Sequence, residues 1–274
     1  MLHQFAPPTD SPLRALRAIS GWEDVPTSDL VPLAAGAIRR QFASGERLGR
    51  AREIQVVVSG TIRHRSEIVG PGGAVGLMEA LARTDAAPAH AVGPVETLGI
   101  ATQHLDDVLE ESFTLWRLTA GHYARRLLQN GVIPAPVAPP FPQDRPLRLS
   151  ERITLLRGVP IPLVTGIEAL AELALAADEI TAEPGDRLWS AGEKPERVLV
   201  LAAGSIRRDD GRLLTPAARP GILESLAGTR FATGGVAEAP VRALSLEIDV
   251  LEDVLEDHPD AARDVLCALV RASF

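Results

Sequence analysis

The sequence predicts an α+β protein built from two tandem units of the same kind. Segments recur in the same order, the offset between the copies drifts slowly, and helical segments flank a group of short strands in each copy. Residues 76–82 (GLMEALA) correspond to residues 221–227 (GILESLA), and the acidic segment 105–111 corresponds to 251–257.

The offset between the two copies grows along the chain. It is 140 for residues 45–48 against 185–188 and 144 for 59–63 against 203–207. It is 145 for the segments at Gly76 and Gly221, and 146 for the acidic segments. Slow drift indicates one folded unit copied once, with a few residues inserted into loops of the second copy.

Composition sets the broad class of the protein. The chain has 274 residues, which is long enough for each of two units to bury its own core. The hydrophobic fraction of 46% is that of a globular protein. Basic residues are almost all arginine, which indicates a GC-rich and therefore bacterial coding sequence. The net charge of −8 argues against a nucleic-acid partner. Without a signal peptide or an apolar stretch long enough to span a bilayer, we expect a cytoplasmic protein with no membrane span.

The predicted domains follow from the repeat and from one proline-rich stretch. Prolines at 134, 136, 139, 140, 142 and 146 exclude helix and central strand, so residues 131–147 read as a Pro-rich linker. A proline-rich ligand for another protein is the alternative reading. The remaining segments are an N-terminal tail (1–12), a first domain (13–130) and a second domain (148–274).

Each unit shows the same order of predicted elements. Two helices come first, then two short strands around a glycine that indicate a hairpin, a short glycine-started helix, a further strand pair and a closing helix. In the first unit these are 13–19, 28–38, 55–59, 61–65, the helix at Gly76, 95–100 and 113–129. In the second they are 152–156, 167–177, 198–202, 205–208, the helix at Gly221, 241–246 and 261–272.

This order resembles the cyclic nucleotide-binding domain, a β-roll flanked by helices. The segments that carry the resemblance are 42–48 (FASGERL) and 182–188 (AEPGDRL), the turns at Gly60 and Gly204, the helix starts at Gly76 and Gly221, and the late acidic segments. The resemblance implies two tandem β-roll (jelly-roll-like) domains.

Both copies depart from the phosphate-binding cassette of that family. The family has a glutamate directly after the glycine and an arginine some ten residues later, where this chain has Leu77 and Ile222, then Ala87 and Thr233. Losing two charge-assisted contacts of about 1.5–3 kcal/mol each would weaken binding by roughly two to four orders of magnitude. The family's C-terminal lid helix has no counterpart either, because Phe274 matches Leu128.

Five residues remain as weak candidates for a rearranged binding site: Gly76, Glu79, Gly221, Glu224 and Arg230. The competing interpretation of the glutamates is structural, since carboxylates are favourable near a helix N-terminus and Glu79 is spaced to form a surface pair with Arg83. Arg230 is the best candidate, because its segment is where the family's arginine is delivered. A cyclic nucleotide is the only cofactor to weigh; otherwise we expect none.

No catalytic or metal-binding motif is found. The histidines show no metal-ligand spacing, and phosphate-loop, dinucleotide-binding and nucleophile-elbow motifs are absent. Cys267 lies among apolar residues of the last helix and is expected to be a buried structural thiol. His64, between Arg63 and Arg65, is expected on a solvated strand face, and the recurring acidic pairs indicate a structural role.

The sequence therefore favours a non-enzymatic bacterial regulatory or scaffold protein that uses its two units to bind a protein partner. The alternative is a sensor of a cyclic mono- or dinucleotide with a non-standard pocket. Because the chain ends directly after the second closing helix, without a helix-turn-helix, we expect no DNA binding. Partner identity, oligomeric state and the packing of the two units stay open.

Overall fold

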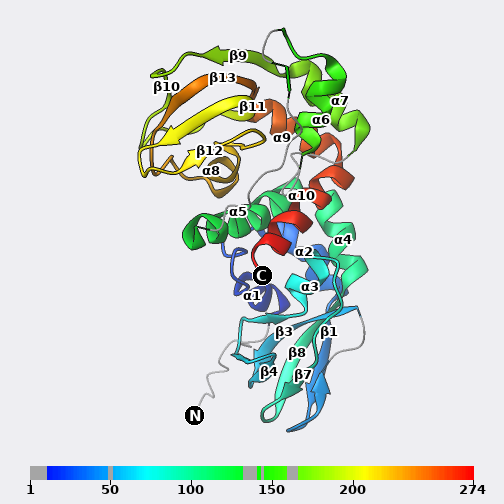
Figure 1. Cartoon of the computed structure of the whole chain (residues 1–274). Coiled ribbons are helices and arrows are strands. Elements are labelled where there is room, and N and C mark those ends of the chain that lie inside the picture. Colours follow the sequence, from blue (N-terminus) through cyan, green and yellow to red (C-terminus); the bar gives the residue numbers. More distant parts are fainter. Residues whose placement is uncertain (1–10, 49–51, 132–140, 143–144, 159–165) are drawn as a thin grey trace, which may run out of the picture. The chain divides into compact units, whose positions relative to one another are not determined.

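The computed structural model describes residues 11–48, 52–131, 141–142, 145–158 and 166–274. They form two compact units (Figure 1), unit 1 up to Thr119 and unit 2 from Ala120, with the boundary inside helix α5 (Phe113–Asn130). Each unit combines antiparallel sheets with flanking helices, which confirms the α+β class.

Unit 1 begins with two helices, continues through short strands around one short helix, and ends on two more helices. Its helices are α1 (Pro12–Arg17), α2 (Thr27–Gly36), α3 (Leu77–Leu81), α4 (Thr102–Glu111) and the first part of α5. Its strands are β1 (Ile38–Phe42), β2 (Arg47–Leu48), β3 (Glu53–Ser59), β4 (Ile62–His64), β5 (Glu67–Val69), β6 (Ala74–Val75), β7 (Ala89–Ala91) and β8 (Val95–Ala101). Ile38 therefore starts a strand instead of ending a helix.

The strands of unit 1 form two four-stranded sheets, β1-β8-β3-β6 and β2-β7-β4-β5. The hairpin expected around Gly60 is wrong, because β3 pairs with β8 and β6 whereas β4 pairs with β5 and β7. Gly60 is where the chain passes from one sheet to the other. It has φ +82°, and a Cβ there would lie 2.3 Å from the carbonyl oxygen of Pro94, so only glycine fits.

Unit 2 repeats this succession with longer strands. Its helices are the second part of α5, α6 (Leu149–Arg157), α7 (Ile167–Ala176), α8 (Ile222–Ala227), α9 (Ile248–Asp257) and α10 (Pro259–Ala272). Its strands are β9 (Asp178–Ala182), β10 (Arg187–Trp189), β11 (Arg197–Arg208), β12 (Leu213–Leu214) and β13 (Gly235–Glu247).

The long strands β11 and β13 pair along their length in a five-stranded sheet. The hairpin expected around Gly204 is therefore also wrong: β11 runs through Gly204 with shifts of register on either side. Gly204 has φ +83°, and a Cβ would lie 2.1 Å from the carbonyl oxygen of Pro240. Here the glycine permits a bulge within one strand.

The start of unit 2 is fixed by arginine contacts to helix ends. Arg145 forms two hydrogen bonds to Glu151 in the first turn of α6, and these lower the pKa of Glu151 to about 2. At the other end of α6, Arg219 donates to the carbonyl oxygens of Leu155, Leu156 and Gly158. Burial lowers the pKa of Arg219 to about 10, so its guanidinium stays charged at neutral pH.

Of the prolines in the predicted linker, those at 134, 136, 139 and 140 lie outside the described residues.

Aliphatic and aromatic side chains fill both cores. Trp22 and Trp116 are among the largest fully buried side chains of unit 1, and Cys267 is buried on α10 in unit 2, as expected. Within the described ranges, no helix is long and apolar enough to cross a membrane. The same residues contain no group of three or more potential metal ligands.

Candidate functional site

Unit 1 contains a cavity of about 730 Å³ at the segment where the sequence places a binding cassette. Its walls come from β2, the start of β3, the α3 region, residues 83–89 and the start of α4. Gly76, Glu79 and Ala87 all line it. Two residues that the sequence proposed for binding, Gly76 and Glu79, therefore lie at one site with Ala87, which stands where the family has an arginine.

The backbone around Gly76 explains the glycine. Gly76 is the N-cap of α3 with φ +85°, and a Cβ there would lie 3.3 Å from the carbonyl oxygen of Glu53. A left-handed N-cap turns the chain sharply from β6 into α3. The next residue, Leu77, is buried, so an aliphatic side chain stands where the resemblance implies a glutamate.

Glu79 differs from its expected role. It is 3% exposed, so the expected surface pair with Arg83 is wrong. Its Oε1 instead accepts a hydrogen bond from Nη2 of Arg65 at 2.8 Å and lies 3.4 Å from Nε2 of His64. The side chain of His64 is only 13% exposed, which corrects the expected solvated position. Glu79 thus anchors the turn after β4 to the cassette helix.

A second polar group lies beside the cavity on the sheet. Nη2 of Arg40 donates to Glu53 at 2.8 Å, and Nε2 of Gln55 donates to the other oxygen of Glu53 at 2.8 Å. Thr97, fully buried on β8, donates to Oε1 of Gln55 at 2.5 Å. Glu53 and Gln55 line the cavity, so one wall is a preorganised polar surface.

Two arginines of the wall, Arg47 and Arg52, are exposed and line the cavity. Within the part of the chain that the structure describes, neither guanidinium group forms a hydrogen bond or ion pair. Arg52 has φ +69°, an uncommon backbone conformation for a residue with a side chain. The cavity therefore offers two guanidinium groups to an incoming acceptor.

The corresponding segment of unit 2 starts at Gly221, the N-cap of α8 with φ +100°. A Cβ at Gly221 would lie 2.5 Å from the carbonyl oxygen of Arg197. Glu224 accepts a hydrogen bond from the backbone N–H of Gly221 at 3.3 Å, the structural role expected of a glutamate at a helix N-terminus. Ile222 is buried.

The remaining positions in unit 2 bind protein atoms. Arg230, the best sequence candidate, is exposed, and its Nη1 donates to the carbonyl oxygen of Gly192 at 2.9 Å. Thr233, at the position of the family's arginine, accepts hydrogen bonds from Arg208 at 2.8 Å and from Nε1 of Trp189 at 2.9 Å. Arg230 and Thr233 thus join loops to strands.

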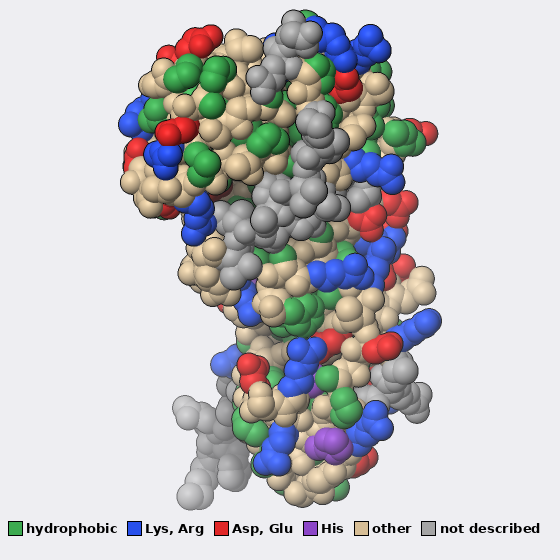
Figure 2. Space-filling view, in the orientation of Figure 1, with side chains coloured by type: hydrophobic (Ala, Val, Ile, Leu, Met, Phe, Trp, Pro, Cys, Tyr) green, Lys and Arg blue, Asp and Glu red, His purple; other side chains and the backbone are tan. Residues whose placement is uncertain are grey.

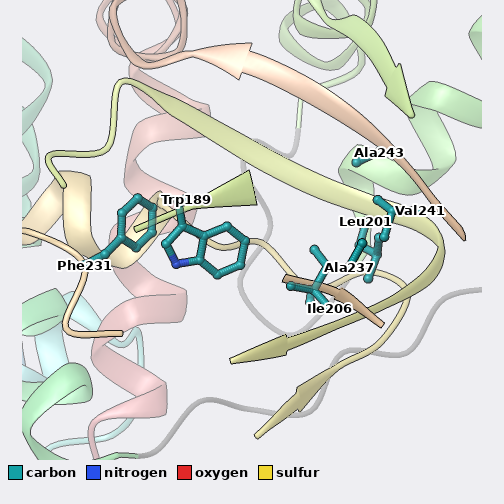
Figure 3. Packing of buried hydrophobic residues seen from close by; sticks show 8 residues of the cluster. Trp189, Leu201, Ile206, Phe231, Ala237, Val241 and Ala243 are labelled. Carbon is teal, nitrogen blue, oxygen red and sulfur yellow. The ribbon is translucent and has the colours of Figure 1, made fainter. Parts of the chain in front are cut away.

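Trp189 lies beside Phe231 among the buried residues of unit 2 (Figure 3). Its ring stacks on Phe231 with the ring centroids 5.3 Å apart, and both side chains are buried. They belong to one cluster with residues of β11 and β13, including Leu201, Ile206 and Ala237. Two stacked aromatic rings therefore occupy the interior of unit 2 near the segment that follows Gly221.

A structure comparison finds similar solved structures. No family model matches the chain, and no curated protein matches it. The regulatory domain of protein kinase A from Toxoplasma gondii, crystallised with cAMP, is 14% identical over 94% of each chain, with a TM-score of 0.35. The regulatory subunit of a cAMP-independent protein kinase A from Trypanosoma brucei is 17% identical over 93% of this chain and 90% of its own, with a TM-score of 0.36.

A bacterial structure covers a single unit's length. The N-terminal domain of a transcriptional regulator from Streptomyces coelicolor is 28% identical over 43% of this chain and 90% of its own, with a TM-score of 0.38. Since these three structures have TM-scores below 0.5, neither their ligands nor their activities are carried over to this chain.

Sequence reasoning missed several residues of these sites. Arg65 and His64 are distant in sequence from Glu79, and no spacing rule links a turn residue to a helix of another sheet. Trp189 left one signal that could have been used: it is an aromatic residue directly after the repeated GDRL segment, where the first copy has Gly49.

Proposed function

We propose that this chain is a non-enzymatic regulatory protein of bacterial origin that acts by binding a protein partner. Its two units, 13–130 and 148–274, are copies of one β-roll domain joined by the Pro-rich segment 131–147. The cassette positions support this proposal: buried aliphatic residues follow both glycines, and Thr233 is engaged within the protein. Neither unit keeps the charged pair that the family uses to hold a phosphate.

The observation that carries the proposal is an exposed apolar stripe on α7 in unit 2. Ile167 and Leu175 are 65% and 72% exposed, and with Ala171 they are spaced four residues apart along one face. Large exposed apolar side chains grouped on one helix face are typical of protein-binding surfaces.

The helix that carries this stripe and its neighbour α9 are both acidic. Helix α9 packs beside α7, and Nε2 of His258 at the end of α9 lies 3.2 Å from Oε2 of Glu172. Neither helix contains Lys or Arg; their acidic residues are Glu168, Glu172, Asp249, Glu252, Asp253, Glu256 and Asp257. We call this surface the α7–α9 face. Its chemistry fits a basic amphipathic helix, whose apolar side chains would cover the stripe.

The test is binding of a basic amphipathic helical peptide to the full chain. The double variant Ile167→Ser/Leu175→Ser is expected to weaken binding roughly ten- to hundredfold, because two large apolar contacts are lost. Ile68→Ser, which removes a 58% exposed apolar side chain from unit 1, is the matched control. Equal affinity of the double variant and the wild type would contradict the proposal.

A second candidate function is supported by the unit 1 cavity. We propose that it is a small-molecule sensor site for a cyclic mono- or dinucleotide or a related anion. At about 730 Å³ the cavity has the size of a ligand site, and Arg47 and Arg52 line it. Calorimetric titration of the full chain against a nucleotide panel tests this.

For a bound nucleotide, the variant Arg47→Ala/Arg52→Ala should lose roughly tenfold or more in affinity, because charge-assisted contacts to phosphate are removed. Arg39→Ala, at a solvent-facing ion pair with Glu96, is the control. If no nucleotide binds at millimolar concentration, the sensor function is wrong.

A further inference from the structure

We infer that Trp189 determines which unit can accept a small molecule. In unit 2, the indole of Trp189 occupies the position that corresponds to the open cavity of unit 1. This inference rests on the second candidate function, in which the unit 1 cavity is a ligand site.

The walls around Trp189 correspond to those of the unit 1 cavity. In unit 1 the cavity is lined by Leu48 of β2, by Gly76 and by Asp85, Ala87 and Ala89. The repeat offsets match these residues to Leu188 of β10, Gly221, Phe231, Thr233 and Gly235. Trp189 directly follows Leu188 on β10 and contacts three of these partners.

The indole is held in place on several sides. One ring face lies against Phe231 (Figure 3). The Nε1–H donates to the carbonyl oxygen of Thr233, and the six-membered ring lies beside Gly235. A Cβ at Gly235 would lie 2.3 Å from the ring, so this glycine leaves the space that the indole occupies. A satisfied polar atom and a 5% exposed ring describe a side chain fitted to its site.

The first unit lacks the indole, the ring on which it stacks and the glycine beside it. The residue matched to Trp189 is Gly49, the one matched to Phe231 is Asp85, and the one matched to Gly235 is Ala89. Asp85 and Ala89 line the open cavity. A ligand entering unit 2 would have to displace a buried, hydrogen-bonded indole, whereas unit 1 requires no such displacement. At this position of the fold, binding of a small molecule is therefore confined to unit 1.

The experiment uses two variants of the full chain and indole as the probe. Trp189→Gly empties the position, while Trp189→Phe keeps it filled with a ring. We expect Trp189→Gly to lower the Tm of unit 2 by roughly 6–20 °C. It should also gain one calorimetric indole site that wild type and Trp189→Phe lack, and indole should restore part of the lost Tm. A folded Trp189→Gly variant that gains no indole site overturns the inference.

A measurement on the wild type keeps the inference testable should Trp189→Gly fail to fold. The indole N–H resonance of Trp189 should stay unchanged at saturation with any nucleotide that binds the chain, and binding should be one per chain. Two equivalent sites, or a shift confined to the Trp189 resonance, overturn the inference. Failure of every nucleotide to bind sinks the sensor function alone, since the indole site in Trp189→Gly does not depend on it.

Discussion

Replacing Gly221 by alanine is expected to lower the free energy of unfolding of unit 2 by about 2–5 kcal/mol. Two effects add. Alanine at φ +100° is strained, and its Cβ would lie 2.5 Å from the carbonyl oxygen of Arg197, which is backbone and cannot move alone. The turn into α8 would have to shift away from β11. Urea unfolding of the full chain, followed by fluorescence and circular dichroism, measures the loss.

Gly185→Ala separates the two effects. Gly185 has φ +98°, but nothing lies within 4 Å of its Cβ position, so only the backbone strain of about 1–2 kcal/mol applies. The difference between the variants is the cost of the close approach between α8 and β11. Equal losses would mean that the chain relaxes freely at Gly221 and that this approach is not rigid.

Most of the helices and the two cassette glycines could be predicted from the sequence because their signals are local, whereas α4 and α9 were recognised only as acidic segments and not as helices. The closing helices 113–129 and 261–272 were predicted close to α5 and α10, and Gly76 and Gly221 were predicted as helix starts. Strand pairing is not local. A small residue between two apolar runs predicts a hairpin, but at Gly60 and Gly204 the same pattern produces a sheet crossing and a bulge. The surroundings of those glycines, not their neighbours in sequence, decide the outcome.

The candidate site was predicted only where one segment builds it. Gly76, Glu79 and Ala87 line one cavity because a single loop and helix carries them. The partner of Glu79 was missed, since Arg65 reaches it from a turn in the other sheet. On Figure 2, Lys and Arg side chains are interspersed with Asp and Glu side chains, in agreement with the scattered arginines of the sequence. Because the arginines are spread along the whole sequence, their positions alone do not indicate which of them, such as Arg219, have specific roles.

Replacing Trp22 by alanine is expected to lower the free energy of unfolding of unit 1 by about 3–5 kcal/mol. Trp22 is 2% exposed, lies between α1 and α2, and is among the largest fully buried side chains. Its removal leaves a cavity beside α5, where Trp22 contacts Thr119. The loss should appear in the unit 1 transition and leave the unit 2 transition in place, as hydrogen exchange of each unit would show.

The hydrogen bond of Trp22 contributes a smaller share, which Thr119→Val isolates. Nε1 of Trp22 donates to Oγ1 of Thr119 at 3.0 Å, and this hydroxyl donates in turn to the carbonyl oxygen of Leu115 at 2.7 Å. Valine keeps the shape but leaves the indole N–H unsatisfied, for a loss of about 1–3 kcal/mol. If Thr119→Val cost as much as Trp22→Ala, the indole would stabilise unit 1 through its polar atom and not through packing. Since the indole ring is 2% exposed, we expect packing to dominate.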